Sequence, residues 1–320
     1  MYPMRKALLL YNPAAGRVPV RPFIQVADRA LTRAGWTVEV VESESGEHTT
    51  HLAQRAAEDG YAAVFAAGGD GTVGQVAAGL VGSETALGVL PAGTSNVWAR
   101  EMGLLPLSWT RPWALRETAL LLANAPICAV DVGECNGRPF LLWAGMGLDA
   151  LTVQRIEPRM RLEKYFSVPQ YAAVTVWHAS TWRGLELRLW ADGERVEGHF
   201  LLALVNNIRH YMGGLANLSP QAYLDDGLMD LWLFSGDSLT DALRHAFDLW
   251  SGRHVNSDQA RRVPFRSLQV EAEAPFAIEM DGEPVFVTER AEITVRPRAL
   301  RVLMPPRALD LLRNAPPLAS

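Results

Sequence analysis

Short apolar runs alternate with amphipathic segments over roughly the first 125 residues of the chain. The runs at 7–11, 37–41, 62–67 and 86–90 have the length of buried strands, and the patterns at 23–34, 49–57 and 72–80 have helical spacing. Strands that alternate with helices in this way are typical of a parallel sheet covered by helices. We therefore expect a Rossmann-like α/β domain over residues 1–126.

From about residue 127 the pattern changes to alternating polar and apolar positions separated by polar turns. Strands are predicted at 127–134, 138–144, 185–190, 197–205, 228–234, 268–272, 276–280, 285–287, 291–295 and 300–305, with helices at 165–182 and 239–250. This pattern indicates a β-sandwich-like domain over residues 127–305. Residues 306–320 are expected to form a tail with a short helix that packs back onto the first domain.

Three loops at the ends of the predicted parallel strands, 12–16, 68–74 and 91–96, are rich in glycine and small polar residues. The carboxyl ends of such strands meet at one edge of the sheet, so we expect these loops to converge into one pocket. Backbone amides at the start of the helix after residue 71 suit an anion. Asp70 would repel a phosphate unless a divalent ion lay between them, which indicates Mg-ATP as the ligand.

Two other nucleotide motifs fit this segment less well. Gly69-x-Gly71-x-x-Gly74 matches the dinucleotide fingerprint, but it follows the third strand and no acidic residue stands about 20 residues later to hold a ribose. Gln75-Val76 replaces the Lys-Ser/Thr pair that a P-loop requires. Hydride transfer is therefore disfavoured, and a P-loop is excluded.

Composition narrows the range of partners. The chain is 49% hydrophobic, enough for two cores, and its net charge of −5 argues against nucleic acid. Cys128 and Cys135 match no zinc or disulfide pattern and are expected to be buried and reduced. The short apolar run before Asn12 and the absence of a long apolar stretch favour a cytoplasmic protein, with peripheral membrane contact left open.

Three ordered blocks, Asn12-Pro13-x-x-Gly16, Gly68-Gly69-Asp70-Gly71-Thr72 and Pro91-x-Gly93-Thr94-x-Asn96, resemble the catalytic domain of diacylglycerol kinases, a family related to sphingosine kinases. The resemblance continues at Val130-Asp131-Val132-Gly133, Gly145-x-Gly147-Leu148-Asp149-Ala150, Gly213-Gly214 with Pro220, Asp225-Asp226-Gly227-Leu228 and Asp281-Gly282-Glu283. NAD kinases and phosphofructokinases share the second block, so the specificity lies in the ordered set, which covers nearly the whole chain.

This resemblance implies an ATP-dependent lipid kinase that acts at the cleft between its domains. It would transfer the γ-phosphate of Mg-ATP to a lipid hydroxyl, with diacylglycerol as the leading acceptor and phosphatidic acid as the product. The implied nucleotide-binding residues are Asn12, Gly16, Gly68, Gly69, Asp70, Gly71, Thr72, Val73, Gly74, Thr94 and Asn96.

The resemblance also implies catalytic, metal and partner roles. Glu283 corresponds to the general base, and Asp70 would act through magnesium. Asp226, with the backbone of Tyr223 and Leu228, corresponds to a structural magnesium site in bacterial members. Asp131 and Arg100 also occupy family positions near the cleft. A transient contact with the inner face of the membrane and a homodimer are compatible with the family.

Two departures keep alternatives open. Gln75 and Val97 stand where the family usually has acidic residues. Phosphorylation of a soluble substrate, as by NAD kinases, and a catalytically weak, lipid-binding regulatory protein are the alternatives. Asp281-Gly282 is also an ordinary two-residue hairpin signal, and Asp225-Asp226-Gly227 an ordinary turn. The sequence names neither the lipid nor the pathway.

Tryptophan is frequent, with ten residues in 320. Trp109, Trp113, Trp177 and Trp182 lie in or beside predicted helices, where they suit a membrane interface or an acyl pocket, or fill the core between the domains. The basic residues at 155, 159, 161 and 164 could meet anionic headgroups or form a solvated loop.

Overall fold

The computed structural model describes residues 5–148, 150 and 182–314. The helix predicted at 165–182, the basic run at 155–164 and Trp177 lie outside these residues, apart from the last residue of the predicted helix. The chain divides into two compact units. Unit 1 is formed by residues 1–132, 224–226 and 297–320, and unit 2 by residues 133–223 and 227–296. The chain therefore returns to unit 1 twice, once briefly and once at its C-terminal end.

Unit 1 is built on a parallel sheet. Its strands are β1 (Arg5–Tyr11), β2 (Trp36–Glu42), β3 (Ala63–Gly68) and β4 (Ala86–Pro91), in the order β2-β1-β3-β4. The end of β15 (Glu283–Leu303) adds to this sheet beside β4, with Val302 opposite Leu87. β3 and β4 are buried along their whole length, as expected for strands covered on both faces.

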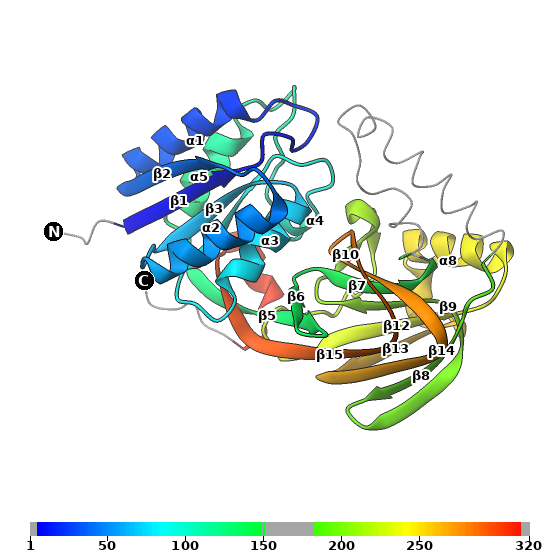
Figure 1. The fold of residues 1–320 in the computed structure, drawn as a ribbon. Coiled ribbons are helices and arrows are strands. Elements are labelled where there is room, and N and C mark those ends of the chain that lie inside the picture. The colour runs from blue at the N-terminus through cyan, green and yellow to red at the C-terminus, as the bar shows by residue number, and fades with distance from the viewer. Residues whose placement is uncertain (1–4, 149, 151–181, 315–320) are drawn as a thin grey trace. The chain divides into compact units, whose positions relative to one another are not determined.

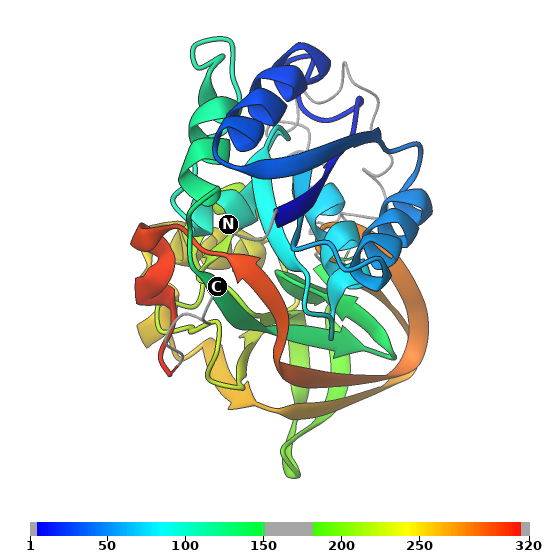
Figure 2. The same ribbon diagram turned by 90° about the vertical axis from the view of Figure 1, so that its left-hand side faces the viewer.

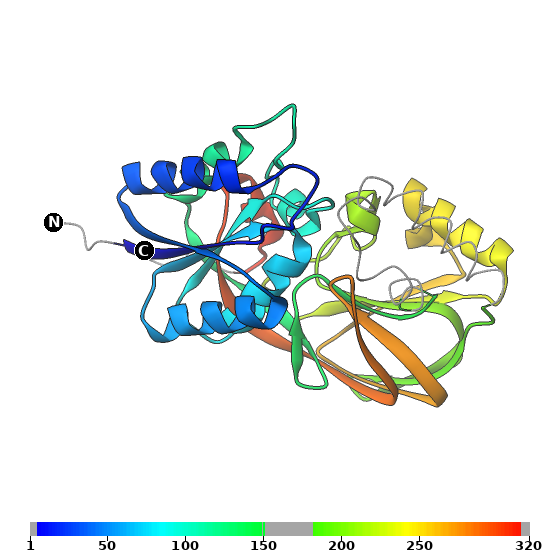
Figure 3. The ribbon, with the colours of Figure 1, turned by 45° about the horizontal axis from the view of Figure 1, so that its top comes forward.

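Helices cover both faces of this sheet (Figure 3). They are α1 (Arg21–Arg33), α2 (Gly46–Glu58), α3 (Asp70–Leu80), the short α4 (Val97–Glu101), α5 (Ala114–Leu122) and the 3-10 helix η4 (Pro306–Leu311). α1 packs with α5 on one face, and α2 packs with α3 on the other. The buried stripe of α1, with Ile24, Ala27 and Leu31, faces the sheet core. The predicted α/β architecture is confirmed.

Unit 2 is antiparallel (Figure 1). Its strands are β5 (Ile127–Cys135, which begins in unit 1), β6 (Arg138–Phe140), β7 (Trp143–Gly147), β8 (Leu185–Ala191), β9 (Glu194–Asn206), β10 (His210–Tyr211), β11 (Ala216–Asn217), β12 (Met229–Ser235), β13 (Ala260–Phe265), β14 (Ser267–Met280) and most of β15. The strand order is β13-β12-β9-β7-β14-β15, and β8 pairs with both β9 and β14. The helical elements are α8 (Leu239–Ser251), η2 (Met212–Gly214) and η3 (Arg253–Asn256). The predicted β-rich second domain is confirmed.

Several predicted strand limits are wrong, for identifiable reasons. The two strands predicted at 268–272 and 276–280 are one strand, β14, with an irregularity between Glu271 and Phe276. The three predicted between 285 and 305 are the single long β15 (Figure 2). Conversely, the strand predicted at 138–144 is broken into β6 and β7, because the N–H groups of Leu141 and Leu142 donate to the Asp281 carboxylate.

The two cysteines are buried and form no disulfide, as predicted. Burial raises the pKa of Cys135 to about 12, so its thiol stays protonated and unreactive. Among the described residues, no helix is long and apolar enough to cross a membrane.

Candidate functional site

The three glycine-rich loops at the strand ends of unit 1 lie against one another, as predicted. The N–H of Asn12 donates to the carbonyl of Ala67 at 3.1 Å, which joins the ends of β1 and β3. The N–H groups of Ala92 and Gly93 both donate to the Gly68 carbonyl, at 2.9 and 3.1 Å, which joins the ends of β3 and β4. The sheet edge therefore gathers these loops around the start of α3.

Glycine is required where the loops touch. A Cβ on Gly16, whose φ is +62°, would lie 2.1 Å from the carbonyl oxygen of Ala92. A Cβ on Gly93 would lie 2.3 Å from the Cα of Gly69. Backbones this close leave no room for side chains, so the loops present mainly main-chain atoms.

The first turn of α3 carries the predicted phosphate-binding amides. α3 begins at Asp70, so the N–H groups of Asp70, Gly71 and Thr72 lie in the first turn, where no intrahelical acceptor is available. The N–H of Val73 already donates to the Gly69 carbonyl at 3.0 Å, and Gly74 lies deeper in the helix. An anion at this helix start would therefore meet the amides up to Thr72 and not those of Val73 or Gly74.

Asp70 is half-buried and has a partner within unit 1. Its Oδ1 accepts a hydrogen bond from the N–H of Trp98 at 3.1 Å, at the start of α4. Loss of water around the carboxylate raises the pKa of Asp70, and nearby backbone N–H groups, including those of Val97 and Trp98, partly offset this rise. Asp70 thus ties the first turn of α3 to the first turn of α4.

The polar side chains of these loops differ in whether they have hydrogen-bond partners. Asn96 has a left-handed backbone, and its side chain bonds the N–H and carbonyl of Gly93, both at 2.8 Å. Asn12 approaches Thr72 with 3.4 Å between Nδ2 and Oγ1. The Thr94 hydroxyl, in contrast, is buried and has no hydrogen-bond partner in the part of the chain that the structure describes. An unsatisfied hydroxyl in this loop fits a site whose ligand would supply the missing partner.

The two positions without the family's acidic residues have other packing roles here. The side-chain amide of Gln75 lies against Gly46 at the start of α2, so closely that a Cβ on Gly46 would be 2.5 Å from Nε2. Val97 is 1% exposed and belongs to the core. Asp70 is therefore the carboxylate that these three loops contribute to the edge.

In unit 2, Asp281 and Gly282 form the two-residue turn between β14 and β15, as the hairpin signal predicted. Both residues have positive φ, +53° and +83°, which matches a tight hairpin. The Asp281 carboxylate accepts hydrogen bonds from the N–H groups of Leu141, Leu142 and Trp143 at 2.9, 2.7 and 3.3 Å. The turn is thereby fastened to the chain between β6 and β7.

Two buried residues that the sequence interpretation did not single out support the same turn. The Oε2 atom of Glu279, a fully buried residue of β14, accepts from the N–H of Gly282 at 2.9 Å. Asn207, just after β9, donates from Nδ2 to the Leu141 carbonyl at 2.8 Å. An acidic residue at an apolar strand position, and paired asparagines at the end of an apolar strand, are the signals that could have revealed them.

Glu283, the predicted general base, is the first residue of β15, opposite Met280. It follows the fastened turn directly and is half-buried. A carboxylate at a strand start next to a braced turn has little backbone freedom, which suits a residue that must be held in position.

Comparison with known proteins agrees with this geometry. Residues 6–135 match a sequence model of the diacylglycerol kinase catalytic domain, and residues 143–304 match the YegS C-terminal NAD kinase beta sandwich-like domain. The chain is 34% identical to a probable lipid kinase YegS-like protein of Pseudomonas aeruginosa, with 97% of each chain covered. The chain belongs to the diacylglycerol kinase family of lipid kinases.

Other relatives extend this result. A diacylglycerol kinase of Mycobacterium tuberculosis is 32% identical, with 94% of this chain and 95% of the relative covered. One of Bacillus subtilis is 28% identical, with 88% and 90% covered. The crystal structure of a putative diacylglycerol kinase from Bacillus anthracis has the same fold, with a TM-score of 0.76, 23% identity, and 96% and 99% of the two chains covered. The protein is accordingly a kinase, an enzyme of the transferase class.

The predicted structural magnesium site in this lipid kinase has a cation beside it. Asp226 Oδ2 lies 3.6 Å from Arg313 Nη1, and the neighbouring Asp225 carboxylate accepts from the N–H groups of Arg313 and Asn314 at 2.6 and 3.0 Å. Among the described residues, no group of three His, Cys, Asp or Glu side chains could hold a metal ion. The predicted site combines one carboxylate with two backbone carbonyls, which such a side-chain group does not include, so the metal role of Asp226, Tyr223 and Leu228 stays a prediction.

Asp131 and Arg100 make structural contacts in the kinase. Asp131 is fully buried, and its Oδ1 accepts from the N–H of Arg298 at 2.7 Å, where the end of β15 has a left-handed residue. Arg100 is exposed and donates from Nε to the Ser95 carbonyl at 2.9 Å. Arg100 thus braces the loop after β4.

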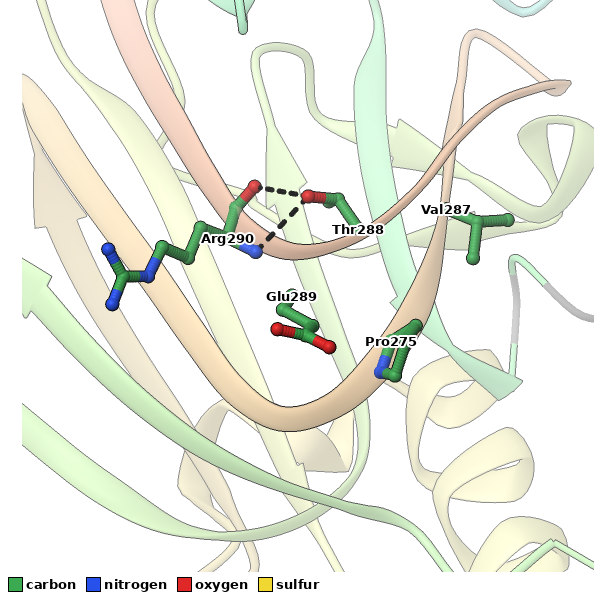
Figure 4. A pocket seen from close by; sticks show the side chains of 5 residues that line it. All are labelled: Pro275, Val287, Thr288, Glu289 and Arg290. Atoms are coloured by element: carbon green, nitrogen blue, oxygen red, sulfur yellow. Dashed lines mark hydrogen bonds between the residues drawn. The ribbon is translucent and has the colours of Figure 1, made fainter.

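A surface hollow of about 390 Å³ lies on the β14–β15 hairpin of the kinase (Figure 4). It is lined by Pro275, Val287, Thr288, Glu289 and Arg290. The Thr288 hydroxyl donates to the Arg290 carbonyl at 2.8 Å and accepts from the Arg290 N–H at 3.2 Å. None of the predicted site residues lines this hollow, so it adds nothing to the site.

Proposed function

We propose that this lipid kinase transfers the γ-phosphate of ATP to the free hydroxyl of diacylglycerol and forms phosphatidic acid. The observation that carries the proposal is the convergence of three glycine loops on the open first turn of α3, with the unsatisfied Thr94 hydroxyl beside them. Relatives from two organisms that bear the name diacylglycerol kinase support the choice of acceptor.

The nucleotide half of the reaction belongs to unit 1. The N–H groups at the start of α3 and the partial positive charge of the helix end would bind phosphate oxygens. Because Gly16, Gly69 and Gly93 carry no side chains, phosphates can approach the main chain. Phosphoryl transfer depends mostly on such positioning and on neutralising charge.

Magnesium would be held by the ATP phosphates and by Asp70, the carboxylate that the three loops contribute. When bound, the ion would neutralise charge on the transferring phosphoryl group. Since Gln75 and Val97 offer no carboxylate, we expect weaker magnesium binding than in family members with acidic residues there.

Glu283 is the proposed general base. Its carboxylate would take the proton of the lipid hydroxyl while that oxygen bonds to the γ-phosphorus. The bond from the γ-phosphorus to the bridging oxygen breaks, and ADP leaves with that electron pair. The anchored Asp281-Gly282 turn would hold the carboxylate where the acceptor hydroxyl can reach it.

Both substrates imply a location. ATP is a cytoplasmic nucleotide and diacylglycerol resides in membranes, so we propose a cytoplasmic protein that touches the inner face of the membrane. Each turnover would then require the protein to reach a lipid whose hydroxyl lies at the bilayer surface.

The test is transfer of γ-labelled phosphate from Mg-ATP to diacylglycerol in mixed micelles, resolved by chromatography. We expect labelled phosphatidic acid from the parent, and turnover lowered by at least about 10² in Glu283→Gln with ATP affinity unchanged, since general bases contribute about 10² to 10⁴. Glu289→Gln, an exposed position on the same strand, is the matched control and should act like the parent.

Three outcomes would contradict the proposal. Label in a soluble acceptor and not in lipid would favour an NAD-kinase-like reaction. ATP binding without any transfer would favour a regulatory lipid-binding protein. Full turnover in Glu283→Gln would remove the base assignment while leaving the acceptor in place.

A further inference from the structure

Two tryptophans on the segment between α4 and α5 are largely exposed. Trp109 is 69% exposed and Trp113 is 66% exposed, and Leu105 nearby is half exposed. The segment that leads into α5 stands out from the body of unit 1 (Figure 2). The interpretation of these two tryptophans as core filling is therefore wrong, because the fold turns both rings toward water.

The backbone under both rings is ordered by hydrogen bonds. Trp109 and the next residue form the middle of a turn in which the N–H of Arg111 donates to the Ser108 carbonyl at 3.0 Å. The Ser108 and Thr110 hydroxyls lie 3.0 Å apart within this turn. Trp113 is the N-cap of α5, and its carbonyl accepts from the N–H of Glu117 at 3.0 Å. The rings thus project from a defined turn and helix start.

The charged side chains nearest the two rings along the chain are arginines, and the exposed Glu117 follows within the first turn of α5. Between Glu101 and Glu117 the only charged side chains are Arg111 and Arg116, and both are exposed. The whole chain carries a net charge of −5, so this segment is locally opposite in sign to the rest. Indole rings favour the boundary between acyl chains and headgroups of a membrane. Arginines beside them can bind the phosphates of anionic headgroups.

A second exposed apolar stripe lacks this charge pattern. Leu243, Phe247 and Trp250 lie on one face of α8 and are 51–70% exposed. Acidic residues Asp241 and Asp248 accompany the cationic Arg244 on that helix. With two acidic residues to one arginine, α8 has no excess of positive charge to attract an anionic surface, which makes Trp250 a suitable control.

We propose that the Trp109–Trp113 segment is the membrane-docking surface of this kinase, with both indoles inserted at the interface and Arg111 and Arg116 against anionic headgroups. The inference rests on the proposed function, since it supplies the contact through which a lipid kinase reaches its substrate. It also makes membrane binding a property of unit 1, separate from ATP binding and from Glu283.

The test is co-sedimentation of the full chain, without ATP, with phosphatidylcholine vesicles that contain or lack phosphatidylglycerol. Removing one large aromatic side chain from the interface costs roughly tenfold or more in partitioning. We expect Trp109→Ala with Trp113→Ala to lower binding to anionic vesicles at least about tenfold. Arg111→Gln should lower it about fivefold and leave binding to neutral vesicles unchanged.

Trp250→Ala, which removes an equally exposed ring from α8, should bind vesicles like the parent. Circular dichroism checks that all variants fold, and phosphate transfer to a soluble short-chain diacylglycerol should be the same for the double variant and the parent. The proposal would be overturned if the double variant bound vesicles like the parent, or if Trp250→Ala lost as much vesicle binding as the double variant. It would also be overturned if these rings bound a protein partner and the chain bound no vesicles. Vesicle binding by a parent that transfers no phosphate would instead contradict the proposed function alone.

Discussion

At the scale of single residues, carboxylates of the motif blocks hold the main chain in place through hydrogen bonds. Asp281 accepts three backbone N–H groups, Asp225 accepts two, and Asp70 and Asp131 accept one each among the bonds described above. Hydrogen bonds to an ionised acceptor are stronger than neutral ones. Acidic residues in motifs such as these therefore shape the loops, whichever of them also meets a substrate.

Asp70→Asn separates the two roles that Asp70 could have. Asparagine keeps an oxygen that can accept from the Trp98 N–H but loses the charge, so we expect Mg-ATP affinity to fall while thermal stability at neutral pH is equal to that of the parent or higher. The variant should not lose stability, because the raised pKa of Asp70 means that the folded state disfavours the charged carboxylate, which asparagine removes.

The pH dependence gives the sign of this effect. Between the ordinary aspartate value of 3.8 and the raised folded value, the folded state binds more protons than the unfolded state, so the free energy of unfolding falls as pH rises through that window. Calorimetry of both proteins should show the advantage of the variant shrinking as pH is lowered. A variant that is clearly less stable at neutral pH would assign the charge itself a structural role.

At the scale of elements, the nucleotide edge depends on close contact between loops. β1, β3 and β4 end at the same level, and their loops approach so closely that glycine alone fits at the contacts. The hairpin of β14 and β15 shows a similar dependence, because its turn is held by the break between β6 and β7.

Gly16→Ala and Gly35→Ala test the loop contact as a matched pair. Both glycines have positive φ, so each alanine costs roughly 1–2 kcal/mol of backbone strain. Only at Gly16 does the new Cβ meet another loop, 2.1 Å from the Ala92 oxygen, while nothing lies within 4 Å of a Cβ on Gly35.

We expect Gly16→Ala to be the less stable of the two and to lose at least about tenfold in ATP affinity, roughly 1.4 kcal/mol. Gly35→Ala should bind ATP like the parent. Chemical denaturation and nucleotide titration measure both quantities. Equal ATP affinity in the two variants would mean that the loop after β1 does not contribute to the nucleotide site.

At the scale of the whole molecule, unit 1 is completed by the C-terminal end of the chain. β15 leaves unit 2 and pairs with β4, and η4 then buries Ala308 and Leu311. The Leu311 carbonyl accepts from the N–H of Leu224 at 2.9 Å, within the short segment that also returns to unit 1. The first 132 residues therefore lack part of their own core.

A chain truncated after Met304 should be less stable than one truncated after Asn314. The first loses two buried side chains, the bond to Leu224 and both backbone donors to Asp225, which together are worth at least about 3 kcal/mol. The second keeps all of these contacts and serves as the control. Denaturant unfolding measures the difference, and equal midpoints would show that η4 does not stabilise unit 1.

The sequence predicted the elements of unit 1 well because each is specified locally. Strands 7–11 and 86–90 and the helix at 23–34 differ from β1, β4 and α1 by a few residues, since apolar periodicity depends on nearest neighbours along the chain. The strands of unit 2 were less well delimited. Bulges and interruptions there depend on partners far away in sequence, such as Asp281 for residues 141–143.

By itself, the sequence determined the two-part architecture, the order of the glycine loops, the hairpin at Asp281-Gly282 and the membership of a lipid kinase family, because these follow from local patterns and motif spacing. Only the tertiary structure decided that Glu279 and Asn207 support the turn before Glu283, that Arg313 stands beside Asp226, and that Trp109 and Trp113 face water. Burial and pairing of a side chain are set by residues distant along the chain, which no local pattern records.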